Sequence, residues 1–215
     1  MAKRTKTGSL QKPSTVKPRR RTHAERRETT RRQLLEATIE CLPELGFGGA
    51  TLEIIAKRAG ASRGALQFHF GNRDDLFLAL LDEIKARLST TTHLEISSSH
   101  SFSERLAVVF DHYWDILNSD HYIAAVHVQI GAMHDPRLYP RVSQIMRDTK
   151  VTLDRRWVKL FAGFNIPVDR LVTARHVALS AMRGMVIRQI IRRSRLPSQK
   201  ERAMLLDMLN QILKP

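Results

Sequence analysis

Residues 51–70, TLEIIAKRAGASRGALQFHF, restrict the fold of this chain more than any other stretch. Apolar residues recur at helical spacing on both sides of Gly60, and Ser62 stands where its hydroxyl can cap the start of the second segment. The pattern predicts a helix over 51–58, a tight turn over 59–61 and a second helix opened by Ser62. Two short helices joined in this way form a helix-turn-helix.

Three consecutive bulky residues in the second of these helices, Phe68, His69 and Phe70, cannot all enter one small core. A helix turns about 100° per residue, so the three side chains point in three directions. Leu66 and Phe70 are the pair expected to face inward. The residues themselves leave open whether Phe68 packs against the following helix and whether His69 is simply solvated.

The first long helix is expected to begin near Glu25 and to end at Gly46. Thr22 and Glu25 form a capping box ahead of it, and Pro43 should kink or fray its last turn. Its apolar face is expected to hold Leu34, Leu35, Thr38, Ile39, Leu42 and Leu45.

Helix signals also dominate the rest of the chain, so the fold class is predicted to be all-α. Further capping boxes stand at Ser101 with Glu104 and at Ser198 with Glu201. Residues 93–101 form the clearest loop. Helices are expected near 73–92, 101–118, 121–134, 140–164, 169–194 and 199–213.

The charge of the chain favours a polyanionic partner. There are 36 Lys and Arg against 21 Asp and Glu, which gives a net charge of +15 and a pI near 10.8. Residues 1–24 hold eight of these cations and no acid, together with Pro13 and Pro18. A disordered basic arm over residues 1–21 is therefore expected to follow a nucleic-acid backbone, with a merely solubilising arm as the alternative.

Several other function classes find no support in the residues. No apolar run is long enough for a membrane span, and the single Cys41 fits a reducing, cytoplasmic compartment. The chain has no GxSxG, no HExxH and no glycine loop for nucleotides, so we expect neither an enzyme nor a cofactor. Four histidines between residues 112 and 134 lack the i, i+4 spacing of metal ligands, and no metal site is expected.

The stretch from about residue 24 to 88 resembles the N-terminal domain of the tetracycline-repressor (TetR) family of bacterial transcription regulators. The resemblance rests on LPELGFGGATLEIIAKRAGASRGALQFHF and on GNRDDLFLALL, which opens the next helix. Gln67 stands where the family usually has Tyr, and Ile54 where a polar residue is common. The resemblance implies a three-helix DNA-binding domain over 22–72 and a helical ligand-sensing and dimerisation domain over 73–215.

The resemblance, taken with the helix geometry, places a set of side chains against double-stranded DNA. Arg63 is the candidate for gripping guanine, and Phe68 and His69 point outward to press on sugar or thymine and to bond a phosphate. Thr51 and Arg73 match family positions that hold the backbone on either side. The complete expected set is Thr51, Glu53, Arg63, Gly64, Ala65, Gln67, Phe68, His69 and Arg73.

The same resemblance implies a homodimer formed through the last two helices, which binds a near-palindromic operator and represses until a small molecule releases it. An uncharged ligand is expected in a pocket that includes Tyr113, Trp114, His127, Gln129 and Met133, because these polar groups are scattered among apolar residues. The alternative reading is a helical architectural protein that binds nucleic acid without selecting sequence.

Overall fold

The structure is a computed structural model that describes residues 22–89, 96–97, 99–192 and 199–215. Within these ranges it is entirely helical, which confirms the all-α prediction. The expected basic arm and the cap at Ser198 lie outside the described residues, as do 93–95 and 98 of the predicted loop, whose other residues are described and are not helical. The helices are α1 (His23–Gly49), α2 (Leu52–Arg58), α3 (Arg63–Phe70), α4 (Arg73–Ser89), α5 (Phe102–Leu117), α6 (Asp120–Gly131), a 3₁₀ turn (Ala132–His134), α7 (Leu138–Leu160), α8 (Val168–Arg192) and α9 (Gln199–Ile212).

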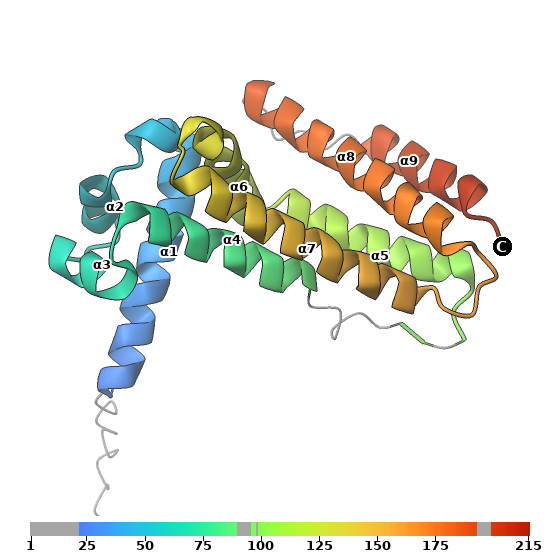
Figure 1. The fold of residues 1–215 in the computed structure, drawn as a ribbon, viewed down its shortest axis with the longest axis horizontal. Coiled ribbons are helices and arrows are strands. Elements are labelled where there is room, and N and C mark those ends of the chain that lie inside the picture. Colours follow the sequence, from blue (N-terminus) through green and yellow to red (C-terminus); the bar gives the residue numbers. More distant parts are fainter. Residues whose placement is uncertain (1–21, 90–95, 98, 193–198) are drawn as a thin grey trace, which may run out of the picture.

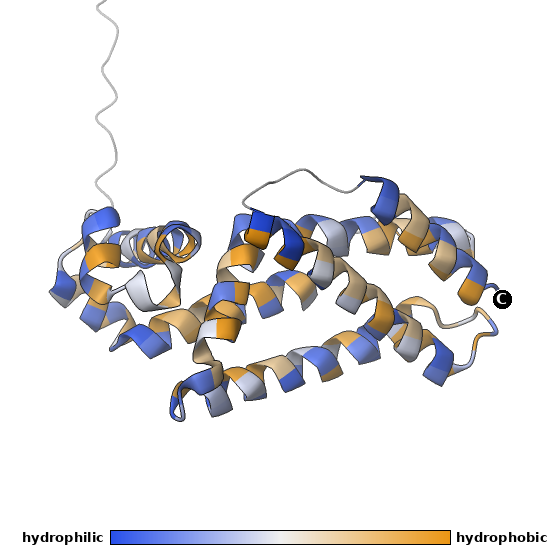
Figure 2. Ribbon diagram, turned by 90° about the horizontal axis from the view of Figure 1, so that it is seen from above, coloured by the Kyte–Doolittle hydropathy of each residue, from blue (hydrophilic) through white to orange (hydrophobic). Residues whose placement is uncertain are grey.

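The molecule is elongated (Figure 1). Helices α1, α2 and α3 lie at one end, and α4 to α9 form a bundle that extends from them, with the C-terminus at the other end. Blue and orange residues alternate along the helices in Figure 2, as amphipathic helices require when each buries only one face. No helix of the described residues is long and apolar enough to cross a membrane.

Helix α1 is longer than the sequence suggested, and it bends at a different residue. The capping box of Thr22 and Glu25 forms as predicted. The bend, however, falls at Gly46, whose φ of 72° leaves the helical region, whereas Pro43 lies within the helix. Glycine adopts this positive φ at no steric cost, so the helix is interrupted there. The five predicted apolar-face residues up to Leu42 are buried, but Leu45 beside the bend is 38% exposed, and its predicted burial was wrong.

The end formed by α1, α2 and α3 is attached to the bundle through α1 and α4. Helix α1 packs against α6, and α4 packs against α6 and α7. At the first contact Gly131 lies directly under the Phe47 ring, and a Cβ built on Gly131 would fall 2.1 Å from Phe47 Cγ. Only glycine lets the two helices approach so closely. The three N-terminal helices are therefore in direct contact with the bundle through α1 and α4.

Candidate nucleic-acid interface and ligand cavity

The helix-turn-helix forms as the sequence predicts, with each short helix capped by a side chain. Thr51 Oγ1 accepts a hydrogen bond from the Ile54 amide at 3.3 Å, and Ser62 Oγ accepts one from the Ala65 amide at 3.1 Å. Gly60 makes the turn with a φ of 64°. Capping satisfies amide groups that helices of seven and eight residues would otherwise leave open.

Burial of one face of α3 leaves the other face free. Leu66 is fully buried and Phe70 is 7% exposed, so the inward pair is as predicted. On the opposite side Arg63, Gly64 and Gln67 are exposed, Ala65 is half-buried, and a Cβ built on Gly64 would meet nothing closer than 3.9 Å. A surface with such small residues at its start can approach a groove closely.

Phe68 does not pack against α4, which was the alternative left open by the sequence. Its side chain is 66% exposed, its ring lies 4.9 Å from the guanidinium carbon of Arg27, and the His69 ring meets it edge-on. Arg31, one turn further along α1, lies over the Phe70 ring at 5.4 Å. Cation–π contacts of this kind hold both arginines beside α3.

The two α1 arginines are neighbours of the interface that sequence reasoning missed. Their spacing of four residues on the first helix puts them on one face, which was the available signal. Half-burial of His69, together with the charges of Arg27 and Arg31, lowers its pKa below the ordinary value. The imidazole is therefore neutral at pH 7 and available as a hydrogen-bond donor or acceptor, while the two guanidinium groups supply the positive charge.

Arg73 and Glu53 differ in the number of contacts that each side chain makes within the protein. The Arg73 guanidinium lies over the rings of Phe47 and Phe77 and donates to the Phe47 carbonyl oxygen at 3.4 Å. Its predicted contact with a DNA backbone would have to use its remaining N–H groups. Glu53 is exposed on α2 and makes no ion pair with Arg63 or with any other cation of the described ranges.

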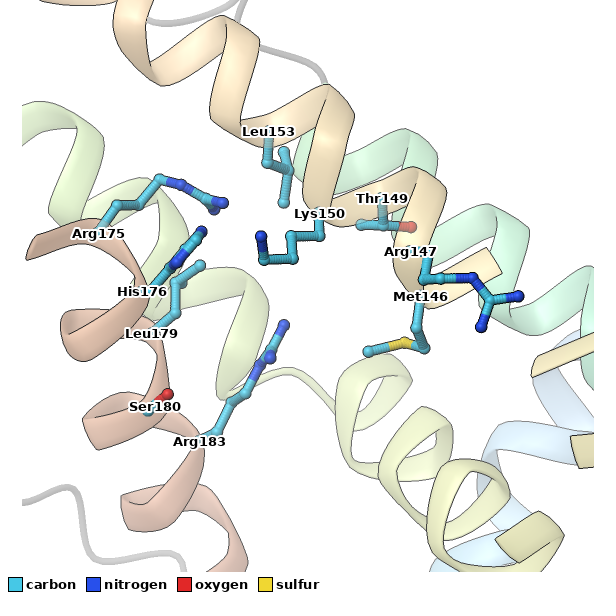
Figure 3. A pocket seen from close by; sticks show the side chains of 10 residues that line it. All are labelled: Met146, Arg147, Thr149, Lys150, Leu153, Arg175, His176, Leu179, Ser180 and Arg183. Atoms are coloured by element: carbon cyan, nitrogen blue, oxygen red, sulfur yellow. The ribbon is translucent and has the colours of Figure 1, made fainter. Parts of the chain in front are cut away.

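A cavity of about 400 Å³ lies between α7 and α8 in the second domain. Its floor is apolar, with Met146 and Leu153 from α7 and Leu179 from α8. Figure 3 shows Lys150 of α7 and Arg175, His176 and Arg183 of α8 directed toward the same space. The volume and the mixture of apolar walls with a few polar groups are those of a small-molecule site.

A much smaller cavity, of about 20 Å³, connects this site to α4. It shares Met146, Thr149 and Arg183 with the larger cavity, and its other walls include Leu81 and Ile84 of α4. Arg183 is also hydrogen-bonded to the Tyr122 hydroxyl of α6, which partly offsets the rise in the Tyr122 pKa caused by burial. Side chains of the ligand cavity thus touch the elements that carry the helix-turn-helix.

Comparison with known proteins agrees with this architecture. The family model for bacterial regulatory proteins of the tetR family matches residues 34–80, which run from the middle of α1 into α4. Over these residues the chain therefore carries the N-terminal domain of tetR-family regulators. Two relatives are the HTH-type transcriptional regulator CymR of Pseudomonas putida, 21% identical over 81% of this chain and 86% of CymR, and the HTH-type transcriptional repressor AcnR of Corynebacterium efficiens, 42% identical over 29% of this chain and 33% of AcnR.

The similarity to AcnR covers only a third of that protein, so it does not extend over the whole of either chain. Among solved structures, the transcriptional regulator FadR from Bacillus subtilis, crystallised with stearoyl-CoA, has a TM-score of 0.59 and 20% identity, and the match covers 85% of this chain and 95% of FadR. This likeness shows that the fold of FadR extends over both domains of this chain. CymR and AcnR are named as transcription regulators.

The five residues predicted for the ligand pocket are not brought together around the α7–α8 cavity. Tyr113 and Trp114 are buried in the core of the bundle, whereas Met133 is 57% exposed. His127 is half-buried, and burial lowers its pKa. Gln129 alone of the five lines the small cavity beside α4.

Proposed function

We propose that this TetR-family regulator is a homodimeric repressor that binds a near-palindromic operator and is released from it by a small molecule in the α7–α8 cavity. The observation that carries the proposal is the free face of α3. Arg63, Gln67 and the largely exposed Phe68 project from a short capped helix that is fixed from behind by Leu66 and Phe70.

Each group on this face has a partner in a major groove. Arg63 can donate two parallel hydrogen bonds to guanine O6 and N7, and the Ala65 methyl can touch the methyl of a thymine. Gln67 can bond a base or a phosphate, and Glu53 can accept from cytosine N4. Thr51 stands at the N-terminus of α2, where helix amides and the dipole favour a phosphate.

The homodimer is supported by an apolar stripe on the last two helices. Val177 is 59% exposed, Ile191 76% and Met204 66%, which is unusual for side chains of this size. A groove of about 380 Å³ between α8 and α9 is lined by Val177, Met208 and Ile212. A contiguous apolar stripe of this kind marks an interaction surface. Its members are Val177, Ile187, Ile191, Met204, Met208 and Ile212.

A second copy is the occupant that this stripe fits best, because two helices packed against their symmetry mates would bury it as a four-helix bundle. The dimer would hold two copies of α3 at a fixed separation. They would then reach successive major grooves, with half-sites roughly 34–36 Å apart or a multiple of that distance.

Release by a ligand requires that the ligand prefer one separation of the two α3 helices. The cavity shares side chains with a contact to α4, so its occupation can shift the equilibrium between two positions of the N-terminal domains. The loss of operator affinity then equals the ratio of the ligand's affinities for the two states.

Selection of bound fragments from the genome that encodes the chain tests the DNA-binding part. The proposal predicts an inverted repeat bound about 10³-fold or more tightly than random duplex at physiological salt. Arg63→Ala should cost about 1–3 kcal/mol at one base pair of each half-site and relax the preference there. Fragments without a common motif, or an equal loss on every sequence in the variant, would instead support non-selective binding by an architectural protein.

A further inference from the structure

We propose that the ligand of the α7–α8 cavity is a small organic carboxylate, held by its anionic end between Lys150, Arg175 and Arg183 and by its apolar body against Met146, Leu153 and Leu179. This inference rests on the proposed regulatory function and names the chemical class of its effector. It reverses the expectation of an uncharged ligand, because the cations concerned are far apart in the sequence and only the fold brings them together.

The charge around the cavity is not balanced by the protein. Among the described residues, Asp154 is the one carboxylate that pairs with cations lining this cavity. It accepts from Arg175 Nε at 3.1 Å, lies 2.8 Å from His176 Nε2, and lies 3.5 Å from Lys150 Nζ. Arg183 is not among its partners. One negative charge shared in this way leaves a net positive site that an anion would neutralise.

Two guanidinium groups also retain unused donors at the cavity. The Arg175 side chain is only 2% exposed, and its Nη1 has no hydrogen-bond partner among the described residues. The same holds for Nε of Arg183. Both guanidinium groups turn toward the cavity in Figure 3. A buried charged donor without an acceptor is costly, and a ligand oxygen would remove that cost.

The remaining walls determine what else the anion must carry. Met146, Leu153 and Leu179 add apolar surface to the cavity beside the cations, which a simple inorganic ion would leave uncovered. A volume of about 400 Å³ lies at the small end of ligand pockets, so the body is a short aliphatic chain or a single ring. A carboxylate suits the guanidinium donors because its two oxygens can accept parallel bonds.

Calorimetric titration of the full chain without DNA tests this assignment. The probes are hexanoate, octanoate, decanoate, benzoate and phenylacetate, each paired with its neutral amide, together with octyl phosphate and inorganic phosphate. At least one carboxylate is expected to bind about tenfold or more tightly than its amide, since hydrogen bonds to charged groups contribute about 1.5–3 kcal/mol. Inorganic phosphate is expected to bind far more weakly than the best carboxylate.

Three variants locate the binding. Arg183→Gln and Lys150→Gln should each weaken the best carboxylate about tenfold while leaving the amide unchanged. Arg155→Gln removes the same charge from an exposed position of α7 that does not line the cavity, and should leave affinity unchanged. Thermal unfolding of each variant checks that it folds, and Lys150, whose side chain is 60% exposed, is the substitution that disturbs packing least.

The assignment is overturned if amides bind as tightly as their acids, if no carboxylate binds, or if Arg155→Gln weakens binding as much as the cavity variants. It is also overturned if octyl phosphate exceeds octanoate tenfold, which would identify a phosphate site, or if inorganic phosphate alone matches the carboxylates. Because DNA is absent from these titrations, any of these results leaves operator binding to be decided by the genomic selection.

Discussion

Burial of the charged Arg175 side chain costs free energy of folding, but it also places this cation on the wall of the cavity. Its side chain is almost fully buried, and the ion pair with Asp154 is what makes that burial tolerable. Such a pair contributes little net stability compared with apolar residues, but it is expensive to break, because the remaining charge stays buried alone. Its retention on the wall of a cavity is consistent with a role in binding.

Asp154→Asn should therefore destabilise the chain by about 3 kcal/mol, the low end of the range for an orphaned buried charge because Asp154 is itself partly exposed. Chemical denaturation measures this difference. Asp148→Asn is the matched control on the same helix, since Asp148 is exposed and bonded only to Gln144, and it should change stability by no more than about 0.5 kcal/mol. Equal changes in stability for the two substitutions would show that the ion pair of Asp154 with Arg175 is not what makes Asp154→Asn destabilising.

The same comparison has a defined dependence on pH. Burial alone would raise the Asp154 pKa, but hydrogen bonds from Arg175 and His176 outweigh it and lower the pKa below the ordinary value. The ionised Asp154 carboxylate therefore contributes its full stabilisation above the pKa of an unfolded aspartate, about 3.9. This contribution is lost as the pH falls through the lower pKa of Asp154 in the folded state. The stability gap between wild type and Asp154→Asn should narrow below about pH 4.

At the scale of elements, α1 of the first domain packs against α6 of the second, and this contact depends on the absence of a side chain at Gly131. Gly131 leaves room for the Phe47 ring, and Phe47 in turn packs against Phe77 of α4 and supports Arg73. One close approach thus fixes the position of three helices. Any side chain at residue 131 must displace the helix-turn-helix relative to the bundle.

Gly131→Ala should cost about 1–3 kcal/mol through overpacking, although alanine is the better helix former. Gly48→Ala is the control, because a Cβ there meets nothing within 4 Å and should leave stability unchanged or slightly higher. Thermal unfolding of the two variants and of the double variant Phe47→Ala, Gly131→Ala makes the comparison. A Gly131→Ala protein as stable as the wild type would contradict this packing. A double variant in which truncating Phe47 does not relieve the overpacking caused by Gly131→Ala would also contradict it.

Periodicity and capping predicted the elements well, because both are local. Helices α2 and α3 and the caps at Thr22, Ser62 and Ser101 form where the sequence places them. The sequence analysis placed the bend at Pro43, but it falls at Gly46. Both residue types interrupt helices, and residue type alone does not show which of the two will do so.

The ligand cavity could not be predicted in the same way. Lys150, Arg175 and Arg183 lie on two helices, and each looks like an ordinary surface cation in the sequence. Only the packing of α7 against α8 turns them toward one space. Conversely, the aromatic and polar residues of α5 and α6 looked like a pocket lining, but packing buries Tyr113 and Trp114 in the core.

At the scale of the whole molecule, the account depends on two α3 helices held at one separation by the stripe on α8 and α9. Helices α8 and α9 lie apart from α3 (Figure 1), so a change on their exposed apolar side chains does not touch the DNA-contacting surface. Val177→Glu places a charge in the groove that Val177 shares with Met208 and Ile212, and it is expected to produce monomers in sedimentation analysis. This variant separates the effect of pairing from the effect of the DNA-contacting surface.

The most direct measurement is a competition titration of the wild type and Val177→Glu against the selected inverted repeat and against the same repeat with its half-sites moved by about half a helical turn, roughly five base pairs. The wild type should bind the original spacing as two chains and lose most of its preference when the half-sites turn to opposite faces, whereas Val177→Glu should bind both duplexes equally weakly. Equal wild-type affinity for the two spacings, or one chain per operator, would contradict the account.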